Sequence, residues 1–204
     1  MKFLLGGSAG LALAIALAIV THRSSERPAS SFRWLPGLVV SAATDERSDD
    51  AATQLGAINE SPDLCSTFDA QELVADVAPM PGRETVLASV ATGVVVLDAV
   101  GRRLAMAPLA ECGGSADGIV ALAVGNAGIG PPMIAVVFSS GGHRESETDL
   151  VLYRVEDGAL RVLFTGTLET RDGDDLETGS AFLLPGMVVY RPPTGPLIFA
   201  RLDR

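Results

Sequence analysis

Short apolar runs separated by turn residues make up the chain from about Leu64 to its end. The runs are four to eight residues long, are rich in β-branched side chains and alternate with Gly, Pro, Asp and Asn, as strands joined by tight turns do. Between two of them, Asp157-Gly158 predicts a two-residue hairpin turn. The pattern predicts an all-β domain of antiparallel meanders over residues 64–204, with strands at 73–78, 85–91, 93–99, 119–125, 133–138, 150–155, 160–166, 181–186, 187–191 and 197–202.

The first 22 residues have a different pattern, which predicts a membrane helix. Phe3–Val20 is a run of eighteen residues without a charge, and a backbone in lipid satisfies its polar groups by forming a helix. The length favours an uncleaved signal anchor. A cleaved signal peptide would need a small-residue site, and Ala16-Leu17-Ala18 lies inside the apolar run. The membrane is therefore the predicted partner of residues 3–20.

Residues 23–63 are predicted to form an acidic tether between this helix and the β domain. The stretch from Thr44 to Asp63 combines high charge with few large apolar residues, which is typical of disorder. The apolar patch 34–40 is too short to cross a bilayer, and we expect it on the membrane surface or packed on the domain.

The distribution of charge narrows the classes of function. The chain has 15 Lys+Arg and 25 Asp+Glu, and its net charge of −10 argues against a nucleic-acid-binding domain. The one lysine is Lys2, so the rest of the chain has no P-loop, Schiff-base or kinase-type lysine. An acidic domain behind a basic, apolar start predicts a cell-envelope protein with an extracytoplasmic domain, or one secreted after cleavage. The arginines after the apolar run favour the opposite, cytoplasmic orientation by the positive-inside rule.

The chain has two cysteines, Cys65 and Cys112, and two histidines, His22 and His143. These are too few for a structural zinc site. In an oxidising compartment the cysteines are expected to pair and tie down the first strand, and the alternative is two buried free thiols.

A pattern of strand, Gly/Pro-rich loop, strand, turn and strand occurs twice, with Asp76 and Asn126 in equivalent places 50 residues apart. A third, more divergent unit begins at Gly179. One meander cannot bury both of its faces, so such units are expected to stack on one another. The first unit resembles the FG-GAP/VCBS type of β-propeller repeat, because Asp76 and Glu84 match the first and last positions of that family's calcium loop.

The resemblance implies a propeller-like fold and does not carry a calcium site. Ala78 and Met80 stand where the family has its middle ligands, and calcium takes several oxygen ligands from one loop. At about 50 residues per unit, the domain has room for fewer than three full-length units, which is short of a closed ring. The expected architecture is therefore an open or sandwich-like stack, or a ring completed by another chain.

Two polar segments are the candidate sites. The loop 139–149 holds His143, Arg144 and Glu145, and we interpret it as a binding loop and not as a catalytic triad, because neighbours in one loop do not hold triad geometry. The acidic turn 172–177 offers candidate calcium ligands, against the alternative of a solvated turn: Asp172, Asp174, Asp175 and Glu177. No catalytic residue and no cofactor-binding residue is predicted.

The sequence therefore predicts a non-enzymatic, envelope-associated β-repeat protein that binds or scaffolds a protein or glycan partner. Two alternatives stay open. One is a metal-dependent hydrolase that uses the acidic turn 172–177 with His143, and the other is a structural domain that self-assembles through unpaired strand edges.

Overall fold

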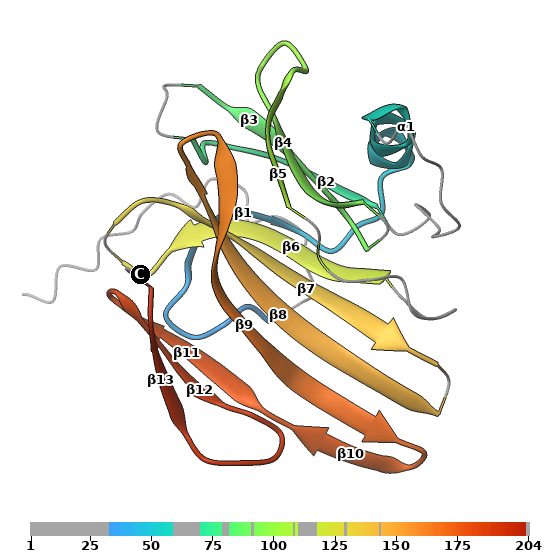
Figure 1. The fold of residues 1–204 in the computed structure, drawn as a ribbon, viewed down its shortest axis with the longest axis vertical. Helices are drawn as coiled ribbons and strands as arrows, with labels where there is room; N and C mark the ends of the chain where they lie inside the picture. Colours follow the sequence, from blue (N-terminus) through green and yellow to red (C-terminus); the bar gives the residue numbers. More distant parts are fainter. Residues whose placement is uncertain are drawn as a thin grey trace, which may run out of the picture.

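Three antiparallel β-sheets and one short helix make up the described part of the chain (Figure 1). The structure is a computed structural model, and it describes residues 33–58, 70–78, 82–90, 92–107, 109, 118–128, 130–142 and 144–202. The prediction of an all-β, antiparallel domain is thereby confirmed.

The first sheet is an up-and-down meander whose four strands lie in chain order. Its central strands are buried on both faces, because Val94 and Val96 face one core while Val95 and Leu97 face another. The second core is closed by helix α1 (Asp49–Ile58), which packs Ala51 and Leu55 onto the sheet. The strands of this β2–β5 sheet are β2 (Gln71–Ala75), β3 (Glu84–Ser89), β4 (Gly93–Leu97) and β5 (Arg103–Ala107).

The second sheet has six strands in the order β1-β6-β7-β8-β9-β10 and curls into a half-barrel (Figure 1). β-Bulges interrupt its register, one between Thr148 and Asp149, and bulges increase the local twist of a sheet. The strands of this central sheet are β1 (Val39–Thr44), β6 (Gly118–Asn126), β7 (Met133–Gly141), β8 (Glu145–Glu156), β9 (Ala159–Asp172) and β10 (Asp175–Thr178).

The β8–β9 connection confirms the predicted hairpin turn. Asp157 and Gly158 are the two loop residues, since Glu156 pairs with Ala159. Both have positive φ, 51° and 77°, and this is the requirement of a type I′ turn, whose twist matches that of the strands.

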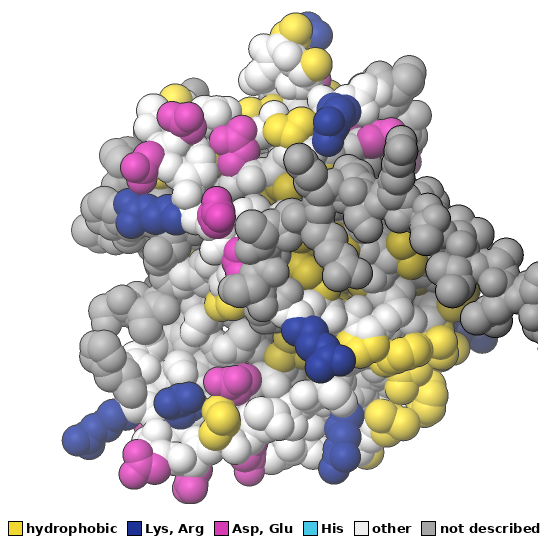
Figure 2. Space-filling model, turned by 180° about the vertical axis from the view of Figure 1, so that it is seen from behind, with side chains coloured by type: hydrophobic (Ala, Val, Ile, Leu, Met, Phe, Trp, Pro, Cys, Tyr) yellow, Lys and Arg dark blue, Asp and Glu magenta, His cyan; other side chains and the backbone are white. Residues whose placement is uncertain are grey.

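The third sheet is a three-stranded meander that continues directly from the second. Its inner face packs Leu183, Val188 and Tyr190 into a core shared with the central sheet. The Tyr190 ring meets Phe164 edge-on with 5.2 Å between centroids, and its hydroxyl donates to the Thr167 carbonyl at 2.7 Å. Its other face carries hydrophobic side chains at the surface (Figure 2). The strands of this β11–β13 sheet are β11 (Ser180–Leu184), β12 (Met187–Arg191) and β13 (Ile198–Arg201).

The three sheets stack as layers with the central sheet in the middle. Because side chains alternate along a strand, Val151 and Tyr153 of β8 face the β2–β5 sheet, whereas Leu150 and Leu152 face the β11–β13 sheet. The buried Gln71 amide links the first two layers by donating to the Ile119 carbonyl at 3.0 Å. In the described residues the three sheets are therefore joined by two apolar cores, one on each face of the central sheet.

Residues 39–58 differ from the expected tether 23–63. Strand β1 pairs with β6 at the edge of the central sheet, and helix α1 is capped by Ser48, whose side-chain oxygen accepts from the Ala51 amide at 3.1 Å. The patch at 34–40 packs on the domain, since Leu35 and Leu38 are buried beside the β11–β13 sheet. The Leu183 amide donates to the Pro36 carbonyl at 2.9 Å, and Gly37 approaches so closely that a Cβ would lie 1.9 Å from the Leu183 oxygen.

Candidate functional site

The two candidate segments of the sequence meet at one end of the central sheet. Most of the predicted loop 139–149 is strand, because residues 139–141 end β7 and residues 145–149 begin β8. The turn 172–177 runs from the last residue of β9 into β10. Glu145 lies opposite Asp172, and Asp172 lies opposite Asp175, so three carboxylates stand side by side on neighbouring strands.

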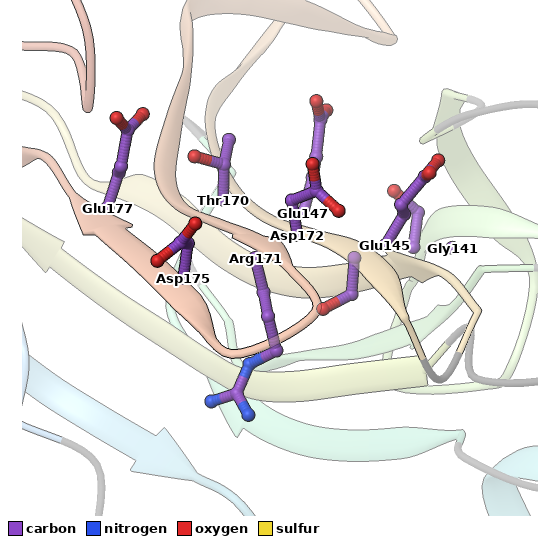
Figure 3. A pocket seen from close by; sticks show the side chains of 10 residues that line it. Gly141, Glu145, Glu147, Thr170, Arg171, Asp172, Asp175 and Glu177 are labelled. Atoms are coloured by element: carbon purple, nitrogen blue, oxygen red, sulfur yellow. The ribbon is translucent and has the colours of Figure 1, made fainter.

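A second row of polar residues follows on the same face. Glu147 lies opposite Thr170, which in turn lies opposite Glu177, and Ser140 of β7 completes the row. Figure 3 shows the five carboxylate side chains on one side of the strands and Arg171 on the other. The alternation of β-strand side chains thus gathers five negative charges on one face.

This face is hollowed. A cavity of about 620 Å³ opens over it, and we call it the acidic hollow. Its lining consists of the five carboxylates together with Ser140, Gly141, Ser146, Thr170 and Arg171. On β7 and β8 the same face carries Phe138 and Val151, which belong to the core with the β2–β5 sheet. The acidic hollow therefore continues the inner face of the central sheet beyond the apolar core.

The carboxylates of the acidic hollow form no salt bridge with an arginine of the described residues. Elsewhere in the described residues three acids, Asp49, Asp98 and Glu156, form salt bridges with arginines. Arg161 and Arg154 contact Glu156 at 2.9 and 3.3 Å, and the hydrogen bond from Arg161 is the main cause that holds the pKa of Glu156 below its usual value. The pKa of Asp98 is likewise lowered, chiefly by the hydrogen bond from the Arg102 amide.

The predicted calcium ligands do not converge on one point. In the part of the chain that the structure describes, no group of three or more His, Cys, Asp or Glu side chains is close enough to hold a metal ion. Asp172, Asp174, Asp175 and Glu177 all belong to the described residues.

The loop that resembles a calcium loop uses its terminal acid for another purpose. Glu84 is buried, and its carboxylate accepts from the amides of Val77 and Ala78 at 2.9 and 3.4 Å. In the second unit, the Asn126 side chain accepts from the Gly128 amide at 2.9 Å. Both side chains hold their own loops by bonding backbone donors. Asp76 and Asn126 themselves line one hollow between the first two sheets, of about 440 Å³.

Several predicted features lie outside the described residues. They are the membrane segment 3–20, both cysteines and His143, the residue of the binding loop that separates Gly142 from Arg144. Among the residues that are described, no helix has the length and apolar character needed to span a bilayer.

Sequence reasoning missed that the two segments form one site, and it also missed Glu147. The signal was available in the spacing, because Glu145-Ser146-Glu147 and Asp175-Leu176-Glu177 each place two acids on one strand face.

Comparison of the chain with family models, curated protein sequences and solved structures finds no match.

Proposed function

We propose that this chain is a non-enzymatic binding module of the cell envelope that holds a basic segment of a partner protein in its acidic hollow. The observation that carries the proposal is the set of five carboxylates on one face of three neighbouring strands. Because they have no arginine partner among the described residues and line an open hollow, their field is available to an incoming cation.

The chemistry of the acidic hollow favours a protein partner over a neutral glycan. Arginine and lysine side chains form charge-assisted hydrogen bonds with carboxylates, and arginine binds them in a bidentate manner. The rows Glu145–Asp172–Asp175 and Glu147–Thr170–Glu177 run across the strands, so an extended basic segment lying across β8, β9 and β10 would meet one carboxylate after another.

The location that fits this function is the outer side of a membrane, with residues 3–20 as the anchor, or the exterior after cleavage. The proposal rests on the apolar run Phe3–Val20 and on the acidic character of the chain beyond residue 43.

We also propose that the sheets are diverged repeats of the FG-GAP/VCBS kind, arranged as a propeller-like open stack. In support, β2–β5 and β6–β9 are both four-stranded meanders in chain order. Asp76 and Asn126 occur at the same place, where the first strand of each meander ends.

A binding experiment with matched charge changes tests the function. The full chain in detergent is titrated with a fluorescent oligo-arginine peptide at several salt concentrations. The triple variant Glu145→Gln, Asp172→Asn, Asp175→Asn is expected to bind about tenfold more weakly, since each exposed ion pair contributes about 0.5 kcal/mol. The salt dependence of binding should also weaken.

The control carries the same change of charge away from the acidic hollow: Glu46→Gln, Asp49→Asn, Asp50→Asn. Asp49 and Asp50 are the first residues of α1, and Glu46 lies three residues before it. Their neutralisation is expected to leave the affinity nearly unchanged. Equal losses of affinity in the two triple variants would contradict the proposal, because they would reduce the effect to net charge.

A further inference from the structure

The outer face of the β11–β13 sheet is an exposed apolar surface. Phe182, Val189 and Phe199 lie opposite one another across the three strands, and the two phenylalanines are 42% and 64% exposed. Leu184 and Met187 form a neighbouring row on the same face. We call these five residues the docking face, and exposed apolar surfaces of this kind mark sites of interaction.

The charge around the docking face is opposite in sign to that of the chain. Residues 179–202 contain no Asp or Glu, although the chain has 25 acids. Arg201 extends the row of Leu184 and Met187, and Arg191 stands opposite Ser180 on the other side of the Phe182 row. Both arginines are exposed, and Figure 2 shows basic side chains beside the hydrophobic ones at the corner that the β11–β13 sheet occupies.

The β11–β13 sheet also lies where the chain arrives from its predicted anchor. Leu35 and Leu38 are buried in the core beneath the β11–β13 sheet, and the Leu183 amide donates to the Pro36 carbonyl. Residues 21–32 connect this point to the apolar run that ends at Val20. Twelve extended residues reach about 40 Å at most, so this sheet is kept within that distance of the membrane if residues 3–20 are inserted.

We propose that the docking face lies on the surface of a bilayer that contains anionic lipids. Its phenylalanine and leucine side chains would enter the interface while Arg191 and Arg201 bind lipid phosphates, as in other peripheral membrane surfaces. The inference rests on the membrane anchoring included in the proposed function. It adds the orientation of the domain relative to the bilayer.

Charge favours this occupant over a second copy of the chain. Two docking faces packed together would bring four arginines to one apolar interface, whereas anionic headgroups neutralise them. The layer order supports the same orientation. The acidic hollow lies on the face of the central sheet that is turned toward the β2–β5 sheet, on the side away from the docking face, so it would point away from the anionic lipids.

Fluorescence quenching by brominated lipids tests this orientation. Trp34 is the one tryptophan, and Trp34→Phe gives a background into which Phe199→Trp is introduced. The matched control is Val100→Trp, since Val100 is 73% exposed at the β4–β5 turn of the most distant layer. Both full-length variants are reconstituted into vesicles of phosphatidylglycerol and phosphatidylcholine with bromine in the upper acyl chain.

The loss of fluorescence is expected to be about threefold larger at position 199 than at position 100, because docked apolar side chains lie about 5–10 Å into the interface. The difference in quenching between positions 199 and 100 should fall by more than about half in vesicles of phosphatidylcholine alone. The same fall is expected in the variant Arg191→Gln, Arg201→Gln. Hydrogen exchange of the unsubstituted chain gives an independent measurement, in which β12 and β13 should be protected by the anionic vesicles.

Each contrary outcome contradicts a specific part of the proposal. Equal quenching at positions 199 and 100, in vesicles that carry the chain on flotation, overturns the docking face and leaves the anchor intact. Failure of the chain to float with vesicles overturns the anchor and the docking face together. An indole at position 199 that is not quenched, but that can be cross-linked between two copies, would overturn lipid docking and assign the face to self-association. Peptide binding in the acidic hollow is measured separately and is not affected by these outcomes.

Discussion

At the scale of single residues, Glu84 is the side chain on which one loop depends. Its buried carboxylate accepts from two backbone amides, those of Val77 and Ala78. Glu84→Ala leaves both donors without this acceptor, and we expect the free energy of unfolding to fall by about 2–3 kcal/mol. Urea denaturation measures the loss, with Glu46→Ala, at an exposed position, as the control. A change as small as that of the control would show that Glu84 does not hold the loop.

Glu84 also shows why residue roles were only partly predictable. An acid at the end of a Gly/Pro-rich loop is equally suited to bind a cation or to accept from loop amides, because both satisfy a carboxylate. Which of the two occurs depends on where the backbone amides of Val77 and Ala78 lie relative to Glu84. The sequence contains the acid and the loop, and the direction of the backbone amides is decided only by tertiary packing.

The lowered pKa of Glu156 predicts how the stability of the β8–β9 hairpin changes at acidic pH. Its pKa is lowered, first by the hydrogen bond from Arg161, so the folded state favours the ionised form more than the unfolded state does. The resulting stability is fully present above the usual value of 4.5 and disappears as the pH falls through the lower folded pKa. Glu156→Gln should therefore lower Tm at pH 7, with the difference shrinking below pH 4.5.

Thermal unfolding followed by circular dichroism between neutral and acidic pH measures this difference. The Glu46→Gln variant, which removes an exposed acid outside the hairpin, should show no such pH-dependent difference. A constant Tm difference between Glu156→Gln and the unsubstituted chain across the range would contradict the role assigned to the Arg161 contact.

At the scale of elements, helix α1 lies in a segment whose high charge predicted disorder. Leu55 is fully buried against Leu87 and Val95 of the β2–β5 sheet. Leu55→Ala is expected to lower the free energy of unfolding by about 2–4 kcal/mol, since it leaves a cavity in this core. Thr53→Ala, on the exposed side of the same helix, is the control. An equally small loss of stability in both variants would contradict the packing of α1 on the β2–β5 sheet.

The elements that were predictable are those with a complete local signature. Ten apolar runs correspond to strands, and Asp157-Gly158 forms its turn, because alternation and turn chemistry are encoded within a few residues. Strands β1, β5 and β10 were missed. Each is an edge strand of its sheet, and β10, with the sequence Asp-Leu-Glu-Thr, has one apolar residue in four. The N-cap residue Ser48 and the four-residue spacing of Ala51 and Leu55 both indicate a helix at α1. The acids around them led to the prediction of disorder instead.

At the scale of the whole molecule, the layers separate two chemically opposite surfaces. The stacking of three sheets could be predicted from meanders that cannot bury both faces alone. The order of the layers could not, because it depends on contacts between distant residues such as Gln71 and Ile119. For the same reason the two acidic segments looked like separate sites. Only the β8–β9 register, with Glu145 opposite Asp172, joins them into the acidic hollow.

The gathered carboxylates predict a stability that increases with salt. Like charges directly opposite each other on neighbouring strands are destabilising, and Glu145, Asp172 and Asp175 have this arrangement. Because salt screens exposed charges, with a screening length that shortens from about 10 Å at 0.1 M to about 3 Å at 1 M, Tm should rise with NaCl. The variant Glu145→Gln, Asp172→Asn, Asp175→Asn should have a higher Tm at low salt and a weaker salt dependence. This would mean that the binding surface is kept at a cost in stability.

Calorimetry with calcium at the same ionic strength separates screening from a cation site. We expect CaCl₂ and NaCl to raise Tm equally, because the described acids converge on no common point. A larger rise with calcium, reversed by a chelator and absent from the triple variant, would contradict this expectation and assign a calcium site to the β9–β10 hairpin. A fall of Tm with NaCl would contradict the repulsion itself, since screening weakens repulsion between like charges and cannot strengthen it.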